Sequence, residues 1–235
     1  MTAGPIGLSL REVGMRYPAA GDAPAVLRDI NLEIPAGDYL VIVGRSGSGK
    51  STLLNLLGCL DQPTEGEVLI GDRVTRTLTE TELAGVRRRD IGFVFQSFNL
   101  IPTLTVRENL LVPLQLNGAD PEAAVERVLG LLAAAGLQDC GARFPEELSG
   151  GEQQRVAIMR AIAHEPAVLI ADEPTGNLDL PTARLILELL ESFGHGQGRT
   201  LIMATHSREV MGRAQRVLEI SEGRLREVGT AGSSS

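Results

Sequence analysis

Short apolar runs alternate with longer amphipathic stretches over most of the chain. This pattern predicts strands at 39–43, 91–95, 168–171 and 201–204, with helices at 51–60 and 182–191. The runs Val41-Ile42-Val43 and Val168-Leu169-Ile170 do not alternate polar with apolar residues, which is typical of central strands buried on both faces. The alternation of strand and helix therefore predicts a mostly parallel sheet covered by helices, with ligands bound beyond the carboxyl ends of its strands.

Two regions depart from this alternation. Residues 8–13 and 27–34 alternate apolar with polar side chains, so we expect them to form an antiparallel sheet packed beside the parallel one. Between them and the end of the chain, helical patterns cover 106–116 and 121–135, and the second of these helices is expected to have Asp120 as its N-cap. We interpret these two helices as an insertion into the α/β core.

The 235 residues are expected to fold as a single α/β domain. Residues 8–96 and 148–228 should form the core with its antiparallel β subdomain, and 97–147 should form the helical subdomain. A hairpin is predicted to turn at Glu222-Gly223. The small residues of 229–235 are expected to form a disordered tail.

Composition excludes several classes of protein. With 22 Lys and Arg against 30 Asp and Glu, the net charge of -8 argues against nucleic acid as the main partner. Cys59 and Cys140 are too few for a disulfide framework or a zinc cluster, which suits a reducing compartment. No apolar run reaches membrane-spanning length and residues 1–7 do not resemble a signal peptide, so we expect a cytoplasmic chain that meets a membrane only through a partner.

A glycine-rich motif follows the first predicted core strand and opens the next helix. The residues Gly44, Arg45, Ser46, Gly47, Ser48, Gly49, Lys50 and Ser51 match the phosphate-loop pattern G-x-x-x-x-G-K-[ST], and with Thr52 they form the expected ATP-binding set. Backbone N–H groups of such a loop surround phosphates, the lysine reaches the β- and γ-phosphates, and the Ser51 hydroxyl can ligate Mg²⁺. Lys50 is the only lysine in the chain, which indicates that this position requires an ammonium group.

Two adjacent carboxylates follow the second buried strand. Asp172 and Glu173 come directly after Val168-Leu169-Ile170-Ala171, at the edge where the phosphate loop also lies if the strands are neighbours. Consecutive strand residues point to opposite sides, so the two acids should have different tasks. We expect Asp172 to hold the Mg²⁺ shell and Glu173 to act as the general base toward the attacking water.

A third motif resembles the signature sequence of ATP-binding cassette (ABC) proteins. It reads Leu148-Ser149-Gly150-Gly151-Glu152-Gln153-Gln154-Arg155, and its small residues open a helix, so it offers a hydroxyl, free N–H groups and a helix dipole. The resemblance implies that the signature of one copy, Leu148 to Glu152, caps the ATP held by the phosphate loop of another. It therefore implies a head-to-tail homodimer that forms on two ATP.

The remaining motifs of that family follow in order. The resemblance implies that Gln96 contacts Mg²⁺ and the attacking water, that Asp179 of the D-loop crosses the dimer interface, and that His206 hydrogen-bonds the γ-phosphate. Glu173, His206 and Gln96 are then the catalytic set, and Ser51, Gln96 and Asp172 the Mg²⁺ set. Tyr17 lies where the family places an aromatic residue that stacks on adenine.

Three further segments look like the branch of ABC proteins that contains macrolide-exporter and lipoprotein-release ATPases. They are 58–61, 91–100 and 105–109. The resemblance implies an ATPase on the cytoplasmic face of the inner membrane, whose helical subdomain receives a helix of integral membrane subunits and drives export or lipoprotein extraction. The chain departs from the family pattern at two places. Ser207 follows His206 where the family commonly has an acidic residue, and the segment 144–147 before the signature is more acidic than expected.

Three other functions share part of this set of motifs. A switch GTPase needs an Asn-Lys-x-Asp motif, which cannot occur because Lys50 is the only lysine. Soluble ABC proteins of DNA repair or translation generally carry two cassettes or long coiled coils, and this chain has one compact cassette. A cassette that transmits force without transport, in cell-envelope signalling or cell division, would carry the same ATPase residues, so this alternative stays open at the level of sequence.

Overall fold

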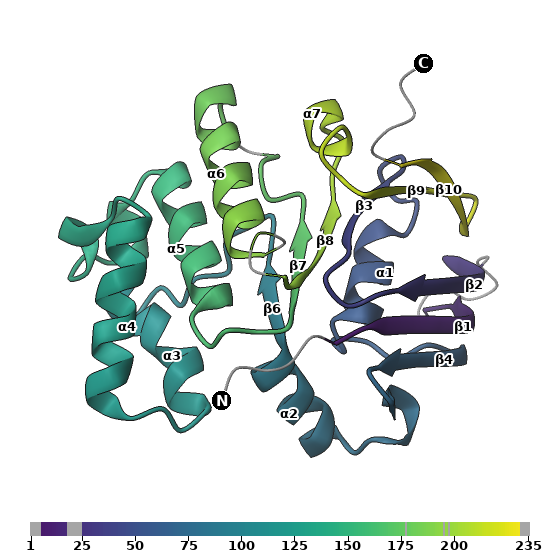
Figure 1. Cartoon of the computed structure of the whole chain (residues 1–235), viewed down its shortest axis with the longest axis horizontal. Helices are drawn as coiled ribbons and strands as arrows, with labels where there is room; N and C mark the ends of the chain where they lie inside the picture. The colour runs from purple at the N-terminus through teal and green to yellow at the C-terminus, as the bar shows by residue number, and fades with distance from the viewer. Residues whose placement is uncertain (1–5, 18–24, 177, 195, 197, 231–235) are drawn as a thin grey trace.

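The computed structural model describes residues 6–17, 25–176, 178–194, 196 and 198–230 (Figure 1). Two sheets organise these residues: a six-stranded sheet in the order β10-β9-β3-β8-β7-β6, and a four-stranded sheet in the order β2-β1-β4-β5. The strands are β1 (Leu8–Met15), β2 (Leu27–Ile34), β3 (Tyr39–Val43), β4 (Glu65–Ile70), β5 (Arg73–Val74), β6 (Ile91–Val94), β7 (Val168–Asp172), β8 (Thr200–Ala204), β9 (Arg216–Ser221) and β10 (Arg224–Thr230). The predicted pair of sheets, one antiparallel and one mostly parallel, is confirmed.

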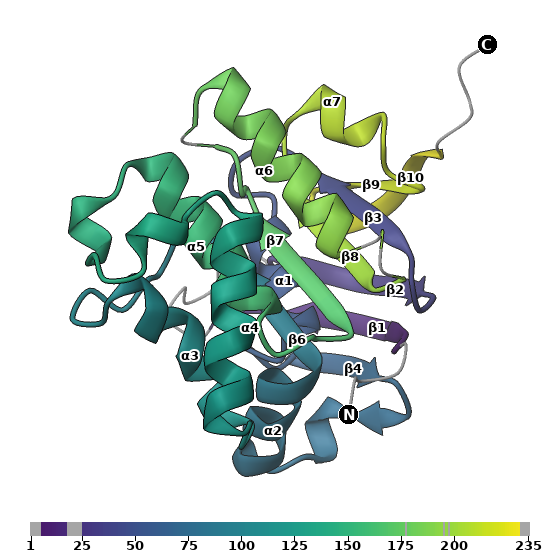
Figure 2. The same ribbon diagram turned by 60° about the vertical axis from the view of Figure 1, so that its left-hand side comes forward.

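The helices pack around these sheets. They are α1 (Lys50–Leu57), α2 (Glu80–Asp90), α3 (Val106–Leu116), α4 (Pro121–Ala134), α5 (Gly150–Ile162), α6 (Leu180–Phe193) and α7 (Arg208–Met211), with short 3₁₀ turns at Thr75–Thr77, Gln138–Cys140 and Pro145–Glu147. In Figures 1 and 2, α3, α4 and α5 form a group on one side of the six-stranded sheet, and the antiparallel sheet lies on the other. Among the described residues no helix combines the length and apolar character that a bilayer span requires.

The parallel part of the large sheet consists of β9, β3, β8, β7 and β6. Its strands separate two apolar cores, because successive side chains of a strand point to opposite faces. Tyr39 and Val41 pack with the core that includes α3 to α6, whereas Leu40 and Ile42 pack with α1 and the antiparallel sheet. Burial on both faces explains why these strands lack polar alternation.

Helix starts in this region follow from local capping. Thr105 caps α3 and exchanges hydrogen bonds with Glu108 in a capping box, and the Asp120 side chain accepts from the N–H groups of Glu122 and Ala123 at the start of α4. The N-cap predicted at Asp120 is therefore confirmed. The Thr105 cap thus sets where the segment between Gln96 and α3 ends.

Some elements differ from the sequence prediction. Helix α2 and strands β4 and β5 were not predicted. The prediction that a disordered tail begins at Gly229 was wrong for Gly229 and Thr230, which belong to a strand. Gly229 pairs with Val217, and β10 continues to Thr230 after a register shift in the ladder; residues 231–235 lie outside the described part of the chain. The predicted hairpin turn is present, with positive φ angles of 53° at Glu222 and 75° at Gly223.

Candidate active site

The carboxyl ends of four neighbouring strands surround one cavity of about 540 Å³. Strand β3 leads into the phosphate loop, β7 ends at Asp172, β8 precedes His206, and β6 precedes Gln96. The cavity is lined by Val26, Ser46, Gly47, Gly49, Lys50, Ser51, Thr52, Gln96, Asp172, Glu173, Gly176 and His206. The fold thus brings the predicted phosphate, metal and catalytic residues of the core to one edge of the sheet.

The phosphate loop is wound around the ammonium group of Lys50. The Lys50 Nζ donates to the carbonyl oxygens of Gly44 at 2.9 Å and Arg45 at 3.4 Å. Gly49, the N-cap of α1, has a φ of 105°, and a Cβ at this position would lie 3.0 Å from the Leu27 side chain, so glycine suits both the backbone and the space. These constraints place Lys50 and the first turn of α1 at the cavity, as phosphate binding requires.

Lys50, Glu173 and His206 form a compact polar triad. The Lys50 Nζ lies 3.2 Å from His206 Nε2 and 3.8 Å from Glu173 Oε1, and His206 Nε2 lies 3.2 Å from the same carboxylate oxygen. Lys50 is 7% exposed, so its charge interacts with these groups more strongly than it would in bulk water. A cation, a carboxylate and an imidazole within this distance can stabilise a phosphoryl group and accept a proton.

Glu173 has an uncommon backbone conformation for its residue type. Its φ is 46°, in the left-handed region, and its N–H donates to the carbonyl of Ala204 at the end of β8 while its carbonyl accepts from the Gly176 N–H. A non-glycine residue in this region is disfavoured by about 1–3 kcal/mol and persists only where surrounding contacts hold it. Here the contacts direct the Glu173 side chain into the cavity.

The donor set at the cavity fits Mg²⁺. Asp172 contributes Oδ1, a buried oxygen without a hydrogen-bond partner among the described residues. Ser51 and Gln96, which line the same cavity, supply a hydroxyl and an amide oxygen. Such hard oxygen donors are the ligands that Mg²⁺ takes, with further oxygens from nucleotide phosphates.

The signature residues lie outside this cavity. Ser149 is the N-cap of α5: its Oγ accepts from the Glu152 N–H, and the Glu152 carboxylate accepts from both the N–H and the hydroxyl of Ser149. These hydrogen bonds lower the pKa of the Glu152 carboxyl. Ser149 and Gly150 are exposed. The predicted signature is therefore a preformed helix start whose residues do not line the cavity at the phosphate loop.

The predicted D-loop residue packs beside the signature. Asp179 caps α6 by accepting from the Thr182 N–H at 3.0 Å and from the Thr182 hydroxyl at 3.0 Å. These hydrogen bonds lower the pKa of the exposed Asp179 carboxyl. A Cβ on Gly151 would lie 2.6 Å from the Thr182 side chain, so the starts of α5 and α6 are in close contact. Asp179, like the signature, does not line the nucleotide cavity.

Replacing Ser149 with alanine tests this cap. We expect Ser149→Ala to lower the free energy of unfolding by about 1 kcal/mol, because it removes the N-cap of α5. Urea denaturation followed by circular dichroism measures this change. Ser192→Ala in α6 is the matched control, since Ser192 is exposed and donates only to a carbonyl of its own helix. Equal stabilities for the two variants would contradict the capping role.

Tyr17 lies beside α1 rather than in the cavity lining. Its hydroxyl donates to Asp61 at 3.0 Å and lies 3.5 Å from the Thr52 Oγ1, and its ring is partly exposed. Sequence reasoning missed two lining residues, Val26 and Gly176. Val26 directly precedes β2, and an aliphatic residue in that position is expected to belong to the core of the strand. The sequence therefore gave no indication that Val26 lines the cavity. Gly176 follows Glu173 within a tight turn, and a glycine has no side-chain chemistry that would mark it as a site residue.

Not all of the predicted ATP-binding residues line this cavity. Arg45 and Ser48 line a neighbouring cavity of about 910 Å³ beside the turn between β9 and β10. A Cβ on Gly44 would lie 2.6 Å from the Ile220 carbonyl oxygen, so Gly44 allows β9 to approach the loop closely. These residues shape the loop, while Ser46 to Thr52, apart from Ser48, face the cavity.

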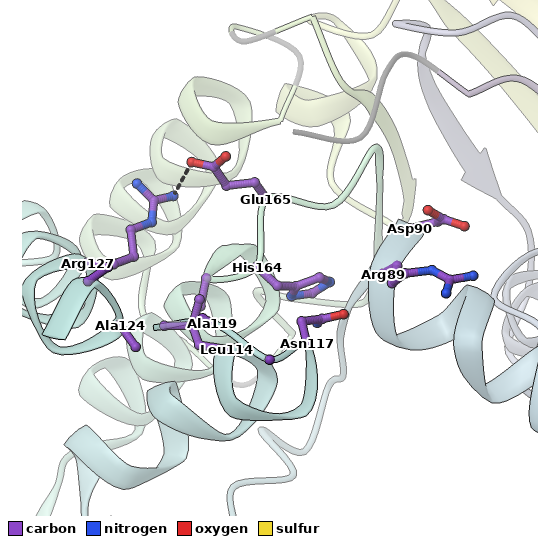
Figure 3. Close-up of a pocket in the computed structure, with 12 residues that line it drawn as sticks. Arg89, Asp90, Leu114, Asn117, Ala119, Ala124, Arg127, His164 and Glu165 are labelled. Carbon is purple, nitrogen blue, oxygen red and sulfur yellow. Dashed lines mark ion pairs between the residues drawn. The ribbon is translucent and has the colours of Figure 1, made fainter. Parts of the chain in front are cut away.

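A further cavity, of about 740 Å³, lies at the other end of β6 (Figure 3). It is lined by residues of α2, α3, α4 and the segment after α5, and none of the predicted site residues is among them. His164 belongs to this lining, and burial lowers the pKa of its imidazole. Its Nε2 lies 3.2 Å from the Ile91 carbonyl oxygen, and the nearby Arg127 pairs with Glu165 at 3.4 Å. His195, the third histidine of the sequence besides His164 and His206, lies outside the described residues.

The geometry defines a P-loop nucleotide-binding protein, because a phosphate loop, its lysine and two strand-end carboxylates share one cavity. Comparison with known proteins identifies the family. The family model described as ABC transporter matches residues 27–176. The chain belongs to the ABC transporter family, and it is an ATP-binding ATPase cassette of that family.

Several relatives show the same relationship. The chain is 45% identical over 222 residues to the macrolide export ATP-binding/permease protein MacB of Burkholderia pseudomallei, covering 94% of this chain and 34% of that protein. It is 48% identical over 200 residues to an uncharacterized ABC transporter ATP-binding protein of Thermotoga maritima, covering 85% of each. The chain thus spans about a third of the length of the MacB relatives.

A solved structure shares the whole fold. It is the dimeric, post-hydrolysis state of the ATP-binding cassette MJ0796 bound to ADP and Pi. The two chains align with a TM-score of 0.89 and 40% sequence identity, over 97% of this chain and 100% of the other. The α/β architecture with its two sheets and helical insertion is therefore that of an ABC cassette.

Proposed function

We propose that two copies of this chain close on two MgATP and that hydrolysis drives a membrane-spanning partner in a transporter of the macrolide-export type. One observation carries this proposal. The cavity of a single chain contains the phosphate loop and the catalytic carboxylate, whereas Ser149 and Gly150 of the signature are exposed elsewhere on the surface. A second copy would supply the signature residues that the cavity of one copy lacks, in keeping with the dimeric state of the related MJ0796 cassette.

Within each cavity the side chains have different roles in ATP hydrolysis. The Lys50 ammonium would bind the β- and γ-phosphate oxygens, and Ser51, Gln96 and Asp172 would hold Mg²⁺, which would neutralise developing charge on the phosphates. Glu173 accepts the proton of the attacking water, and His206 hydrogen-bonds the γ-phosphate. Because Glu173 and His206 already lie within 3.2 Å of each other, the water and the phosphate would meet adjacent groups.

The signature closes the site from the other copy. The exposed start of α5 offers backbone N–H groups and the Ser149 hydroxyl to a γ-phosphate, and the helix dipole favours that negative charge. Glu152 stabilises this helix start through its capping hydrogen bonds, and Leu148, directly before Ser149, is buried in the core. Asp179 is the N-cap of α6, and in this dimer it would contact the facing copy. We infer a two-fold dimer with both nucleotides at the interface.

The membrane partner is inferred from the relatives. The MacB proteins carry the words ATP-binding and permease in one name, and their remaining length lies beyond the region that this chain matches. We therefore place the chain at the cytoplasmic face of the inner membrane, with its partner either a separate subunit or part of a longer polypeptide. Transport is favoured over force transmission without transport, because the reported relatives bear export and transporter names.

Co-purification tests the membrane assignment. A tagged Glu173→Gln chain, isolated with MgATP from detergent-solubilised membranes of its host, should bring down a protein with membrane-spanning helices. Tagged Lys50→Ala should recover less of that protein, because it cannot close on ATP. Recovery of the Glu173→Gln chain alone, from a preparation in which an unrelated membrane complex stays intact, would contradict membrane coupling and favour a soluble ABC role.

A further inference from the structure

The segment that follows Gln96 has an unusual backbone. Phe98 and Asn99 have φ angles of 59° and 51°, both in the left-handed region. This conformation is disfavoured by about 1–2 kcal/mol per residue for L-amino acids, and a bulky residue such as Phe98 seldom adopts it. The Asn99 N–H donates back to the Ser97 carbonyl at 2.6 Å, so the chain makes a tight turn directly after Gln96. Contacts from elsewhere must hold this turn.

Arg160 of α5 supplies two of these contacts. Its Nη1 donates to the Asn99 carbonyl at 2.6 Å, and its Nη2 donates to the Phe98 carbonyl at 3.2 Å. The planar guanidinium presents both donors in a fixed geometry, which a lysine ammonium could not reproduce. Burial lowers the pKa of Arg160, as expected for a cation that has exchanged water for protein carbonyls.

The same helix meets the turn at its other end. The Phe98 ring lies against Gly150, where a Cβ would be 3.8 Å from the ring atom Cζ. Helix α5 therefore holds the turn both near its start, beside the signature, and near its end, through Arg160. Gln96, two residues before Phe98, reaches the cavity, where a Cβ on Gly176 would lie 3.3 Å from its Nε2.

We propose that Arg160 is a positioning residue for Gln96. By holding the carbonyls of Phe98 and Asn99, Arg160 stabilises the left-handed turn that directs the Gln96 amide into the cavity that Ser51 and Asp172 also line. Arg160 touches neither substrate nor metal, so its effect on hydrolysis passes through Gln96. This inference rests on the role proposed for Gln96 in ATP hydrolysis.

Replacing Arg160 tests the inference in the full chain. We expect Arg160→Gln to lower kcat for ATP hydrolysis about tenfold, because small misplacements of an active-site group slow reactions steeply, while KM changes less than about twofold. Arg160→Lys keeps the charge but not the paired donors, so it should show most of the same loss and serves where Arg160→Gln folds poorly. The matched control is Arg87→Gln, since Arg87 also donates to a backbone carbonyl, that of Cys59 at 2.8 Å, and pairs with Glu80 rather than with the turn after Gln96.

A double-mutant cycle with Gln96 separates positioning from general destabilisation. In a Gln96→Ala background, Arg160→Gln should change kcat less than about twofold, while it lowers the melting temperature as much as it does in the unmodified background. An equal fall in kcat in both backgrounds, or an equal fall in Arg87→Gln, would overturn the inference. Absence of ATP hydrolysis by the unmodified chain would instead contradict the proposed function, so the two failures are distinguishable.

Discussion

Glu173→Gln is expected to lower the rate of ATP hydrolysis about 1,000-fold while ATP still binds. The amide cannot accept the proton of the attacking water, but it keeps the size and hydrogen-bonding shape of the carboxylate. The left-handed backbone at Glu173, held by the Ala204 carbonyl, should also remain, because the substitution changes only the end of the side chain. Phosphate release from the purified variant at saturating MgATP measures the rate.

The control for this prediction is Glu188→Gln in α6, an exposed carboxylate on the same helix as the D-loop cap. Its hydrolysis rate should stay within about twofold of the unmodified chain, as is usual for surface substitutions. ATP affinity, measured by calorimetry, should be similar in both variants. Retained hydrolysis in Glu173→Gln would remove Glu173 from the general-base role.

Lys50→Ala is expected to weaken ATP binding about 100-fold, because it removes the ammonium that a buried phosphate would otherwise meet. It also removes the donor that the Gly44 and Arg45 carbonyls share, so the phosphate loop loses part of its internal support. Titration with a fluorescent ATP analogue gives the affinity. An unchanged affinity would contradict the assignment of the phosphate loop.

Lys50→Arg separates charge from shape at this position. It keeps the positive charge, but its guanidinium is larger and planar and does not fit the space between two carbonyls that are 2.9 Å and 3.4 Å from Nζ. We expect most of the loss in affinity to remain. Such a result would explain why a chain whose other basic residues are all arginine has lysine here. Full recovery by arginine would show that charge alone is sufficient.

Sequence predicted which residues come together in one cavity where particular residue types stand next to particular elements. The phosphate-loop pattern before α1 identifies Lys50 as a site residue. Asp172 and Glu173 are identified by their position at the end of a strand that lacks polar alternation. Parallel strands bring such positions to one edge, so the meeting of these residues in one cavity follows from the fold class. The capping box of Ser149 and Glu152 was not predicted, although the Ser-x-x-Glu spacing that allows it is present in the sequence.

The parts that sequence did not predict depend on tertiary contacts. Helix α2 buries only Leu83, Val86 and Asp90, too few apolar positions for a helical period to stand out. Strand β5 has two residues and is formed through its pairing with β4. The left-handed backbone of Phe98 opposes the preference of its residue type, and it becomes intelligible only when Arg160, 62 positions away, is placed beside it.

The measurement that tests the account most directly is the mass of the Glu173→Gln chain in solution, by light scattering with and without MgATP. The composite site predicts 25.0 kDa without nucleotide and twice that mass with it, and it predicts that adding Ser149→Arg prevents the dimer while ATP still binds. A Glu173→Gln chain that binds ATP and stays monomeric would contradict the central claim that each nucleotide is enclosed by two copies of the chain.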